Sequence, residues 1–176
     1  MNQISIKKID YFLSFQHLKM TTRGLFGFYY KGKYYVIYNH CDSYPSGLGY
    51  NIVKEIEAEM KQYNNLDRWI KLLTKIKIIT EDQKPTQLDI DNLKEYTCLD
   101  VGYKRTDDWD CLLYKTNGSV NQVLQSGYMI NNVDEDGNPI FYEYAYIINL
   151  DSNQFDFYVD DNLIASFKLT ALPQFV

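Results

Sequence analysis

The residues best suited to chemistry lie in two short segments near the N-terminus, Thr22-Arg23-Gly24 and the loop at 39–49, NHCDSYPSGLG. The loop ends directly before apolar residues at helical spacing. Its last backbone N–H groups would therefore lie at a helix N-terminus, which attracts phosphate and carboxylate. Arg23 would add a fork of donors for the same anion. We therefore expect a site for a small anionic ligand, such as a nucleotide. It would be formed by Arg23, Asn39, Asp42, Tyr44, Ser46, Gly47 and Gly49.

The same residues allow a purely structural interpretation. Ser46 would cap the helix, the glycines would satisfy turn geometry, and Arg23 would pair with Asp42. Each such interaction is worth about 1 kcal/mol. Both interpretations stay open at this level.

His40 and Asp42 support a second hypothesis, a hydrolase or transferase. On an extended segment these two side chains project to the same face, where histidine could do acid-base chemistry near neutral pH. Cys41 projects to the opposite face, which disfavours a Cys–His nucleophile pair. Removal of Met20 would expose Thr21 as an N-terminal nucleophile, but the residues that precede Thr21 count against this version. A hydrogen-bonded histidine in a turn is the structural alternative.

Metal and cofactor motifs are missing from the sequence. Its two histidines, His17 and His40, cannot build a multi-histidine site. Asp134 begins a run that resembles a calcium loop, but the twelfth position is Ala145, where an EF-hand needs glutamate. No GxxxxGK[ST], GxGxxG or GxSxG motif occurs. We therefore expect neither a metal ion nor a cofactor.

The composition is typical of a globular protein that stays where it is made. Hydrophobic residues make up 45% of the chain and charged residues 23%, which predicts a folded core. A formal net charge of -5 argues against an extended nucleic-acid surface. The apolar stretches are far shorter than the ~20 residues of a membrane span, and signal-peptide regions are missing. We expect a cytoplasmic protein without membrane contact, whose Cys41, Cys98 and Cys111 are reduced.

The elements that position the candidate site begin with a β-hairpin. Residues 25–30 and 33–38 are rich in aromatic and β-branched types, and Lys31-Gly32 between them forms a short turn. A helix is then expected from about Gly47 to Tyr63. Its buried face would consist of Leu48, Ile52, Val53, Ile56 and Met60.

Further helices are expected after Asn64-Asn65, at Thr86 with Asp89, and as two short turns between 107 and 126. The last third switches to strand-like runs at 128–133, 140–150, 154–159 and 163–169, separated by Asp- and Asn-rich turns. The sequence thus predicts an α+β fold with a mixed, mainly antiparallel sheet, made of the N-terminal hairpin and a C-terminal meander. Helices from the middle of the chain would cover one face. Residues 1–20 would be an extension or peripheral segment, and residues 21–176 one domain.

Tyrosine is frequent, with 17 residues, and several crowd the hairpin. These are Tyr29, Tyr30, Tyr34, Tyr35, Tyr38 and Tyr44. Most are expected to pack as cross-strand pairs, while exposed rings could stack on a ligand. A third hypothesis is therefore a protein–protein surface, for a partner or a second copy of the chain. A contiguous aromatic patch would favour it, whereas a deep pocket at Arg23 would oppose it.

The segment TRGLFGFYYKGKYYVIYNHCDSYPSGLG, with YEYAYIINLD later in the chain, resembles a group of uncharacterised proteins from large DNA viruses, phages and fungi. The shared pattern is TRG, an aromatic hairpin and YNxxDSYPxGLG, and it covers residues 22–49. The resemblance implies no activity. It implies that Arg23, Asn39, Asp42, Tyr44, Pro45 and Gly47 act as a unit. Tyr, Asn, Ile and Lys are abundant, a bias that A/T-rich genomes produce through codon usage, and this would suit a viral protein in host cytoplasm or a virion.

Overall fold

The computed structural model describes residues 22–80, 82–100 and 105–175. Their contacts cluster in two compact units. The sheet unit contains the described residues up to Ile56 and those from Asn132 onward, and the helical unit contains those between Glu57 and Asn131. The expected boundary after residue 20 lies outside the described residues. The division into an extension and one domain stays a prediction.

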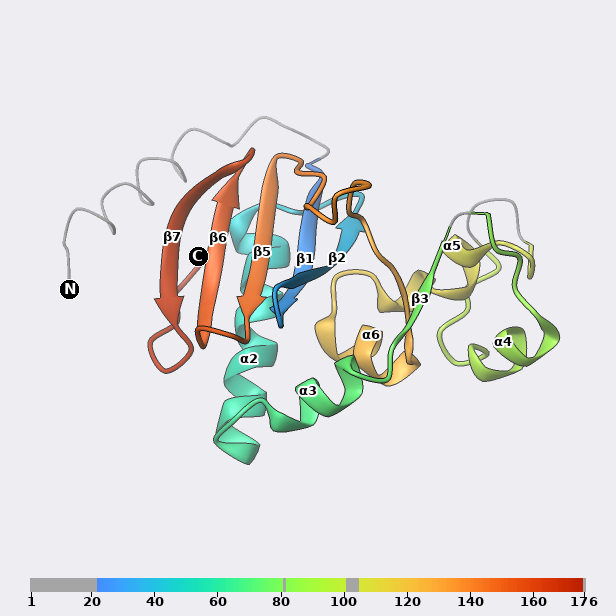
Figure 1. Cartoon of the computed structure of the whole chain (residues 1–176), viewed down its shortest axis with the longest axis horizontal. Coiled ribbons are helices and arrows are strands. Elements are labelled where there is room, and N and C mark those ends of the chain that lie inside the picture. The colour runs from blue at the N-terminus through green and yellow to red at the C-terminus, as the bar shows by residue number, and fades with distance from the viewer. Residues whose placement is uncertain (1–21, 81, 101–104, 176) are drawn as a thin grey trace. The chain divides into compact units, whose positions relative to one another are not determined.

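The sheet unit is built on a five-stranded sheet with the order β2-β1-β5-β6-β7 (Figure 1). The strands are β1 Gly24–Tyr30, β2 Lys33–Asn39, β5 Tyr144–Asn149, β6 Gln154–Val159 and β7 Asn162–Lys168. Every neighbouring pair is antiparallel except β1 and β5, which run parallel. This confirms the predicted α+β class with a mixed, mainly antiparallel sheet.

The hairpin of β1 and β2 forms as its turn residues predict. Lys31 and Gly32 both have positive φ, 50° and 71°, as a two-residue turn between right-twisted strands requires. Their backbone N–H groups donate to the carboxylate of Asp151, at 2.9 and 3.2 Å. The turn is therefore held both by its own backbone geometry and by the β5–β6 connection.

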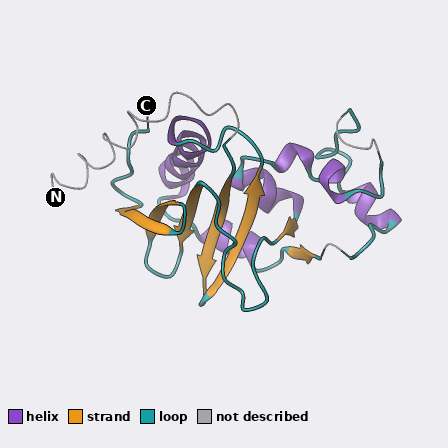
Figure 2. Ribbon diagram, turned by 90° about the horizontal axis from the view of Figure 1, so that it is seen from above, coloured by secondary structure: helices purple, strands orange, loops and turns teal. Residues whose placement is uncertain are grey.

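One face of the sheet is covered by helix α2, Tyr50–Tyr63 (Figures 1 and 2). A single π-helical turn, η1, Pro45–Gly49, leads into this helix. The predicted apolar residues Leu48, Ile52, Val53 and Ile56 are all buried. Behind the sheet they share the core with a group of aromatic rings. That group is Phe26, Phe28, Tyr146, Phe155, Phe157 and Phe175.

Two residues near the end of α2 differ from the predicted helix face. Met60 is only half-buried, whereas Glu59 is buried. The reason is an ion pair, because Arg68 donates from Nε and Nη2 to the Glu59 carboxylate, with a shortest distance of 2.5 Å. Apolar spacing alone could not indicate a buried charge with a partner nine residues away.

The helical unit contains short helices and one small sheet. Its elements are α3 Asp67–Leu73, β3 Lys77–Ile79, α4 Gln87–Asn92, α5 Trp109–Leu112, the 3-10 turn η2 Tyr114–Thr116, α6 Val120–Ser126 and β4 Tyr128–Ile130. The predicted start of α4 is confirmed, since Thr86 and Asp89 form a capping box. The core of this unit is Ile79, Leu93, Trp109, Leu112, Leu113 and Tyr128.

The expected C-terminal meander is wrong in one part. Only Tyr128–Ile130 of residues 128–133 form a strand, and this strand pairs in parallel with β3 in a separate two-stranded sheet. The cause is local, because Gly127 ends α6 with a left-handed φ of 74° and its carbonyl accepts from Lys77 N–H at 2.8 Å. That contact aligns β4 beside β3. The strand expected at 140–150 also begins later, at Tyr144.

Candidate functional site

The loop between β2 and α2 is tied together by buried polar side chains. Asn39 Nδ2 donates to Ser43 Oγ at 2.8 Å and to the Cys41 carbonyl. Ser43 N–H donates to Thr22 Oγ1 at 2.9 Å, which links the loop to the residue before Arg23. Asn39, Ser43 and Thr22 are all buried. The expected approach of the two segments is therefore real, and a hydrogen-bond network fixes it.

Backbone N–H groups at the start of the helix donate to carbonyls of the same loop. Gly47 N–H donates to the Tyr44 carbonyl at 3.0 Å, and Leu48 N–H donates to the Asp42 carbonyl at 2.9 Å. The first turn begins at Pro45, so the exposed Ser46 lies inside the turn and is not its cap. These two backbone groups thus have acceptors within the loop, which removes them from the expected anion site.

Glycine is required at the two loop positions by close packing. A Cβ on Gly49 would lie 2.7 Å from the ring of Tyr146 and 3.0 Å from that of Phe175. A Cβ on Gly47 would collide with the Asp42 carbonyl. The Gly-Leu-Gly sequence therefore allows the helix start to approach the aromatic core.

Arg23 lies beside the end of β2, as hairpin pairing predicts, since Gly24 pairs with Asn39. Its charged partner, however, is Glu143 and not Asp42. Arg23 N–H donates to Glu143 Oε2 at 3.1 Å, and the guanidinium Nε and Nη2 each lie 3.4 Å from Oε1. The guanidinium also lies 5.5 Å from the ring centroid of Tyr142, and 52% of the Arg23 side chain is exposed.

Two more residues complete what we call the Arg23 cluster, which consists of Arg23, Tyr38, His40, Tyr142 and Glu143. The rings of Tyr38 and Tyr142 lie 4.7 Å apart, and the Tyr38 hydroxyl shares a 2.8 Å hydrogen bond with His40 Nδ1. Burial and Tyr142 raise the pKa of Tyr38, although Arg23 acts in the opposite direction. Burial would raise the pKa of Glu143, but backbone hydrogen bonds and Arg23 lower it overall. The cluster is an exposed cation framed by aromatic rings.

Sequence reasoning missed Tyr142 and Glu143. They precede β5, and they reach Arg23 because β5 runs parallel to β1 with Tyr144 paired to Gly24. No local pattern in the sequence indicates which strand lies beside the hairpin. The sole signal was the YEYAYIINLD segment noted with the resemblance, in which both residues occur.

The proposed acid-base pair is not assembled. His40 Nδ1 meets the Tyr38 hydroxyl, while Asp42 has a left-handed φ of 55° and contributes its carbonyl to Leu48. No hydrogen bond joins His40 to Asp42 in this fully described part of the chain. Thr21, the alternative nucleophile, lies outside the described residues.

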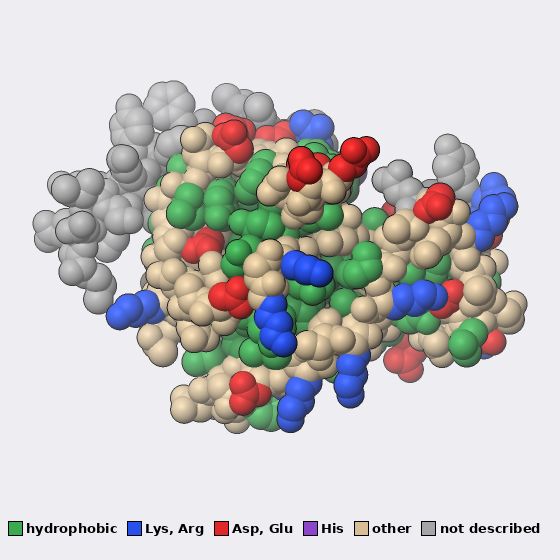
Figure 3. Space-filling model, viewed as in Figure 1, with side chains coloured by type: hydrophobic (Ala, Val, Ile, Leu, Met, Phe, Trp, Pro, Cys, Tyr) green, Lys and Arg blue, Asp and Glu red, His purple; other side chains and the backbone are tan. Residues whose placement is uncertain are grey.

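The sheet surface opposite α2 is rich in tyrosine. We call it the tyrosine face; it is formed by half-buried rings and Val133 around the buried Leu25, Val36, Ala145 and Ile147. The half-buried residues are Tyr29, Tyr34, Tyr38, Val133, Phe141, Tyr142 and Tyr158. Hydrophobic side chains gather over the sheet on the side turned to the viewer in Figure 3, which is the side away from α2. The Arg23 cluster contributes Tyr38 and Tyr142 to this face.

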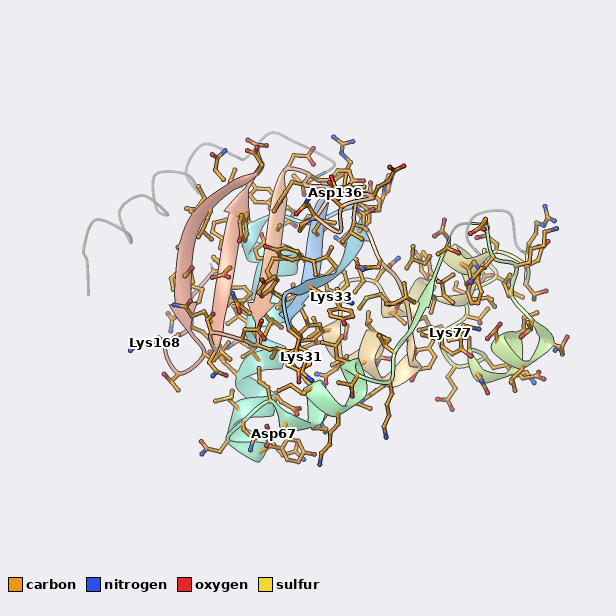
Figure 4. All side chains as sticks on the ribbon, in the orientation of Figure 1. Lys31, Lys33, Asp67, Lys77, Asp136 and Lys168 are labelled. Carbon is orange, nitrogen blue, oxygen red and sulfur yellow. The ribbon has the colours of Figure 1, made fainter. Side chains whose placement is uncertain are left out.

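In the helical unit, the buried carboxylate of Asp89 is hydrogen-bonded to other residues of the same unit. Asp89 accepts from Lys77 Nζ at 2.6 Å and from the Tyr128 hydroxyl at 2.9 Å, and Lys77 is labelled on β3 in Figure 4. A cavity of about 480 Å³ opens nearby between β3 and the start of α5. Its lining includes Arg105, which already pairs with Asp107 at 2.7 Å.

Within the described ranges, no group of three or more His, Cys, Asp or Glu side chains is placed to hold a metal ion. The three cysteines are free thiols; Cys41 is exposed, Cys98 half-buried and Cys111 buried. No helix among the described residues has the length and apolar character needed to cross a membrane.

No protein-family model matches the chain, and neither does any curated protein or solved structure.

Proposed function

We propose that this chain is a binding module that holds a small anionic ligand at the Arg23 cluster. The observation that carries the proposal is the state of the Arg23 guanidinium. It is more than half exposed, and its side-chain contacts with Glu143 are 3.4 Å, long for a charge-assisted hydrogen bond of about 2.8 Å. Such a guanidinium retains donors for a phosphate or carboxylate.

The surroundings of Arg23 favour a ligand with a flat apolar part next to its charge. Tyr142 lies under the guanidinium and Tyr38 packs against Tyr142, so two rings border the cation. Aromatic rings beside a cation are suited to stacking on a base or ring. A nucleotide combines these features. Asp42 and the loop glycines then shape the loop beside the cluster, and neither they nor Ser46 touch the ligand.

A thermal-shift screen with inorganic phosphate, nucleotides and small carboxylates tests this proposal. A bound anion should raise the melting temperature of the wild type, because it binds the folded state alone. Arg23→Ala should abolish the shift while lowering the free energy of unfolding by no more than ~1 kcal/mol, as for an exposed ion pair. Arg105→Ala is the matched control, since Arg105 is also in an exposed ion pair with a carboxylate, that of Asp107, and its loss should leave the shift intact. A flat screen, or an equal shift in Arg23→Ala, would refute the anion site.

The tyrosine face favours a second candidate function, binding of a protein partner. Its partly exposed tyrosine rings, with Arg23 beside them, have the residue types enriched in the centres of protein interfaces. A flat anion screen would leave this function as the better explanation of the face. The viral source and virion or host-cytoplasm location belong to the same proposal, and they are supported by the sequence resemblance alone.

A further inference from the structure

One carboxylate lies within the tyrosine face, away from Arg23. Asp156 on β6 is only 6% exposed, and its two oxygens accept from Ser166 Oγ at 2.5 Å and from Asn149 Nδ2 at 3.3 Å. Both of these donors are neutral. No Lys or Arg pairs with Asp156 among the described residues, although a buried carboxylate usually has a cationic partner.

The register of the sheet places one position without a side chain in the same row as this carboxylate. Asp156 pairs with Ile147, which pairs in turn with Gly27 on β1. Gly27 has a φ of 149°, a conformation that side chains rarely adopt, and a Cβ there would collide with the Tyr35 carbonyl. In the row that runs from Asp156 through Ile147, the position on β1 therefore carries no side chain.

Tyrosines flank this position on the same face of the sheet. Tyr29 and Tyr34 are cross-strand partners whose ring centroids lie 4.7 Å apart, two pairs along from Gly27. Tyr158 lies two residues after Asp156 on β6, and its ring centroid is 5.1 Å from that of Phe141. Burial, Tyr34 and Asp156 together raise the pKa of Tyr158 to about 12, and burial, Tyr29 and Asp156 raise that of Tyr34. The phenol groups of Tyr34 and Tyr158 thus lie within electrostatic reach of each other and of the carboxylate.

The carboxylate of Asp156 and the neighbouring tyrosine rings together favour binding of an organic cation. Ring faces carry negative charge density and attract ammonium groups, most strongly where water is partly excluded. The Asp156 carboxylate adds a full negative charge, which would repel anions. A hard metal ion is a poor fit, because calcium takes six to eight oxygen ligands and a single carboxylate is present. The nearest lysine by register, Lys168, pairs with Gln154 and lies at the outer edge of the sheet on β7 (Figure 4).

We propose that Asp156, together with Tyr29, Tyr34 and Tyr158, forms a site for an alkylammonium group, supplied by a lysine side chain or by a free amine. This site is separate from the Arg23 cluster and does not depend on the anion proposal. An ammonium group would lie over the tyrosine rings and complete the charge balance of Asp156.

An NMR titration of the full chain with n-butylammonium chloride tests the site. We expect saturable shifts of the amide signals around residues 34 and 156–158 at millimolar concentration, and none with n-butanol, which has the same alkyl chain without the charge. Asp156→Asn keeps the side-chain shape and should weaken binding at least about tenfold, equal to ~1.4 kcal/mol. Asp160→Asn, a change of an exposed carboxylate after the same strand, should bind as the wild type does.

Two further variants separate loss of the site from loss of folding. Tyr34→Phe keeps the ring and should retain most of the affinity, whereas Tyr34→Ala should lose it while the remaining amide spectrum stays dispersed. Titrations with N-acetyl-lysine methylamide and with spermidine then show which source binds better. Equal shifts in Asp156→Asn and the wild type, or equal binding of n-butanol, would overturn the proposal. Saturable binding that depends on Asp156 would support it.

Discussion

The hydroxyl of Tyr146, on the central strand β5, donates a 2.9 Å hydrogen bond to the carbonyl of Ser43, which lies 103 residues earlier in the chain. Ser43 is itself held by Thr22 and Asn39. This bond therefore joins the middle of the sheet to the loop that starts helix α2. Tyr146 is fully buried, so its hydroxyl and the carbonyl depend on each other.

Tyr146→Phe should lower the free energy of unfolding by about 1–2 kcal/mol, because it leaves a buried carbonyl without its donor. Chemical denaturation at neutral pH measures this change. Tyr144→Phe is the matched control, since Tyr144 is also buried on β5 and its hydroxyl donates no hydrogen bond to a described residue. If the two variants lost equal stability, the Tyr146–Ser43 bond would have no particular role.

Gly49→Ala should destabilise the chain by about 1–3 kcal/mol, the usual cost of overpacking a core. The added methyl group would press against Tyr146 and Phe175, both of which are packed in the core behind the sheet. Ser46→Ala in the same turn is exposed and should change stability by less than about 0.5 kcal/mol. The melting temperatures of the two variants measure this difference. A Gly49→Ala variant that melts at the wild-type temperature would contradict the close approach of Gly49 to the two rings.

Arg68→Ala should lower the free energy of unfolding by about 3 kcal/mol, because it leaves the buried Glu59 carboxylate without its cation. Arg68→Lys should recover only part of this loss, since lysine cannot form the same forked contact. Lys71→Ala, an exposed change on the same helix, serves as the control. Urea denaturation of the three variants provides the comparison, and stability close to wild type in Arg68→Ala would show that Glu59 is not dependent on Arg68.

Asp89 should make the stability of the chain depend on pH in the acid range. Burial alone would raise the pKa of Asp89, but hydrogen bonds from Lys77, Thr86 and Tyr128 lower it far below its ordinary value. A carboxyl whose pKa is lowered on folding stabilises the protein above the unfolded pKa, about 3.9 for aspartate. This stabilisation is lost as the pH falls from about 4 through the folded pKa.

Asp89→Asn should therefore be least stable relative to wild type at neutral pH, by about 2 kcal/mol, and the difference should shrink below pH ~4. Denaturation curves at a series of pH values measure it. Asp91→Asn on the same helix is the control, because Asp91 pairs with Lys94 at the surface. A difference that stays constant with pH would show that the Asp89 charge contributes nothing.

The sequence by itself determined the local structure around the candidate site. The hairpin follows from Lys31-Gly32, whose backbone tolerates positive φ, and the start of α4 follows from the Thr86–Asp89 capping pattern. The buried face of α2 follows from apolar spacing as far as Ile56. In each case the deciding interactions join residues only a few positions apart, so composition and spacing carry the information.

Only the tertiary structure decided which residues meet across long stretches of chain. Arg23 faces Glu143, 120 residues away, because β5 inserts beside β1 in parallel. Asp156 comes within reach of Tyr34 because three strand pairings place Tyr34 in the row of Gln154, two residues before Asp156 on β6. Strand order depends on the packing of whole strands in one core, and alternation along a single strand is the same whichever neighbour it has. The sequence could therefore indicate Arg23 and the tyrosines as residues of interest, and the packing of the sheet alone gave them their partners.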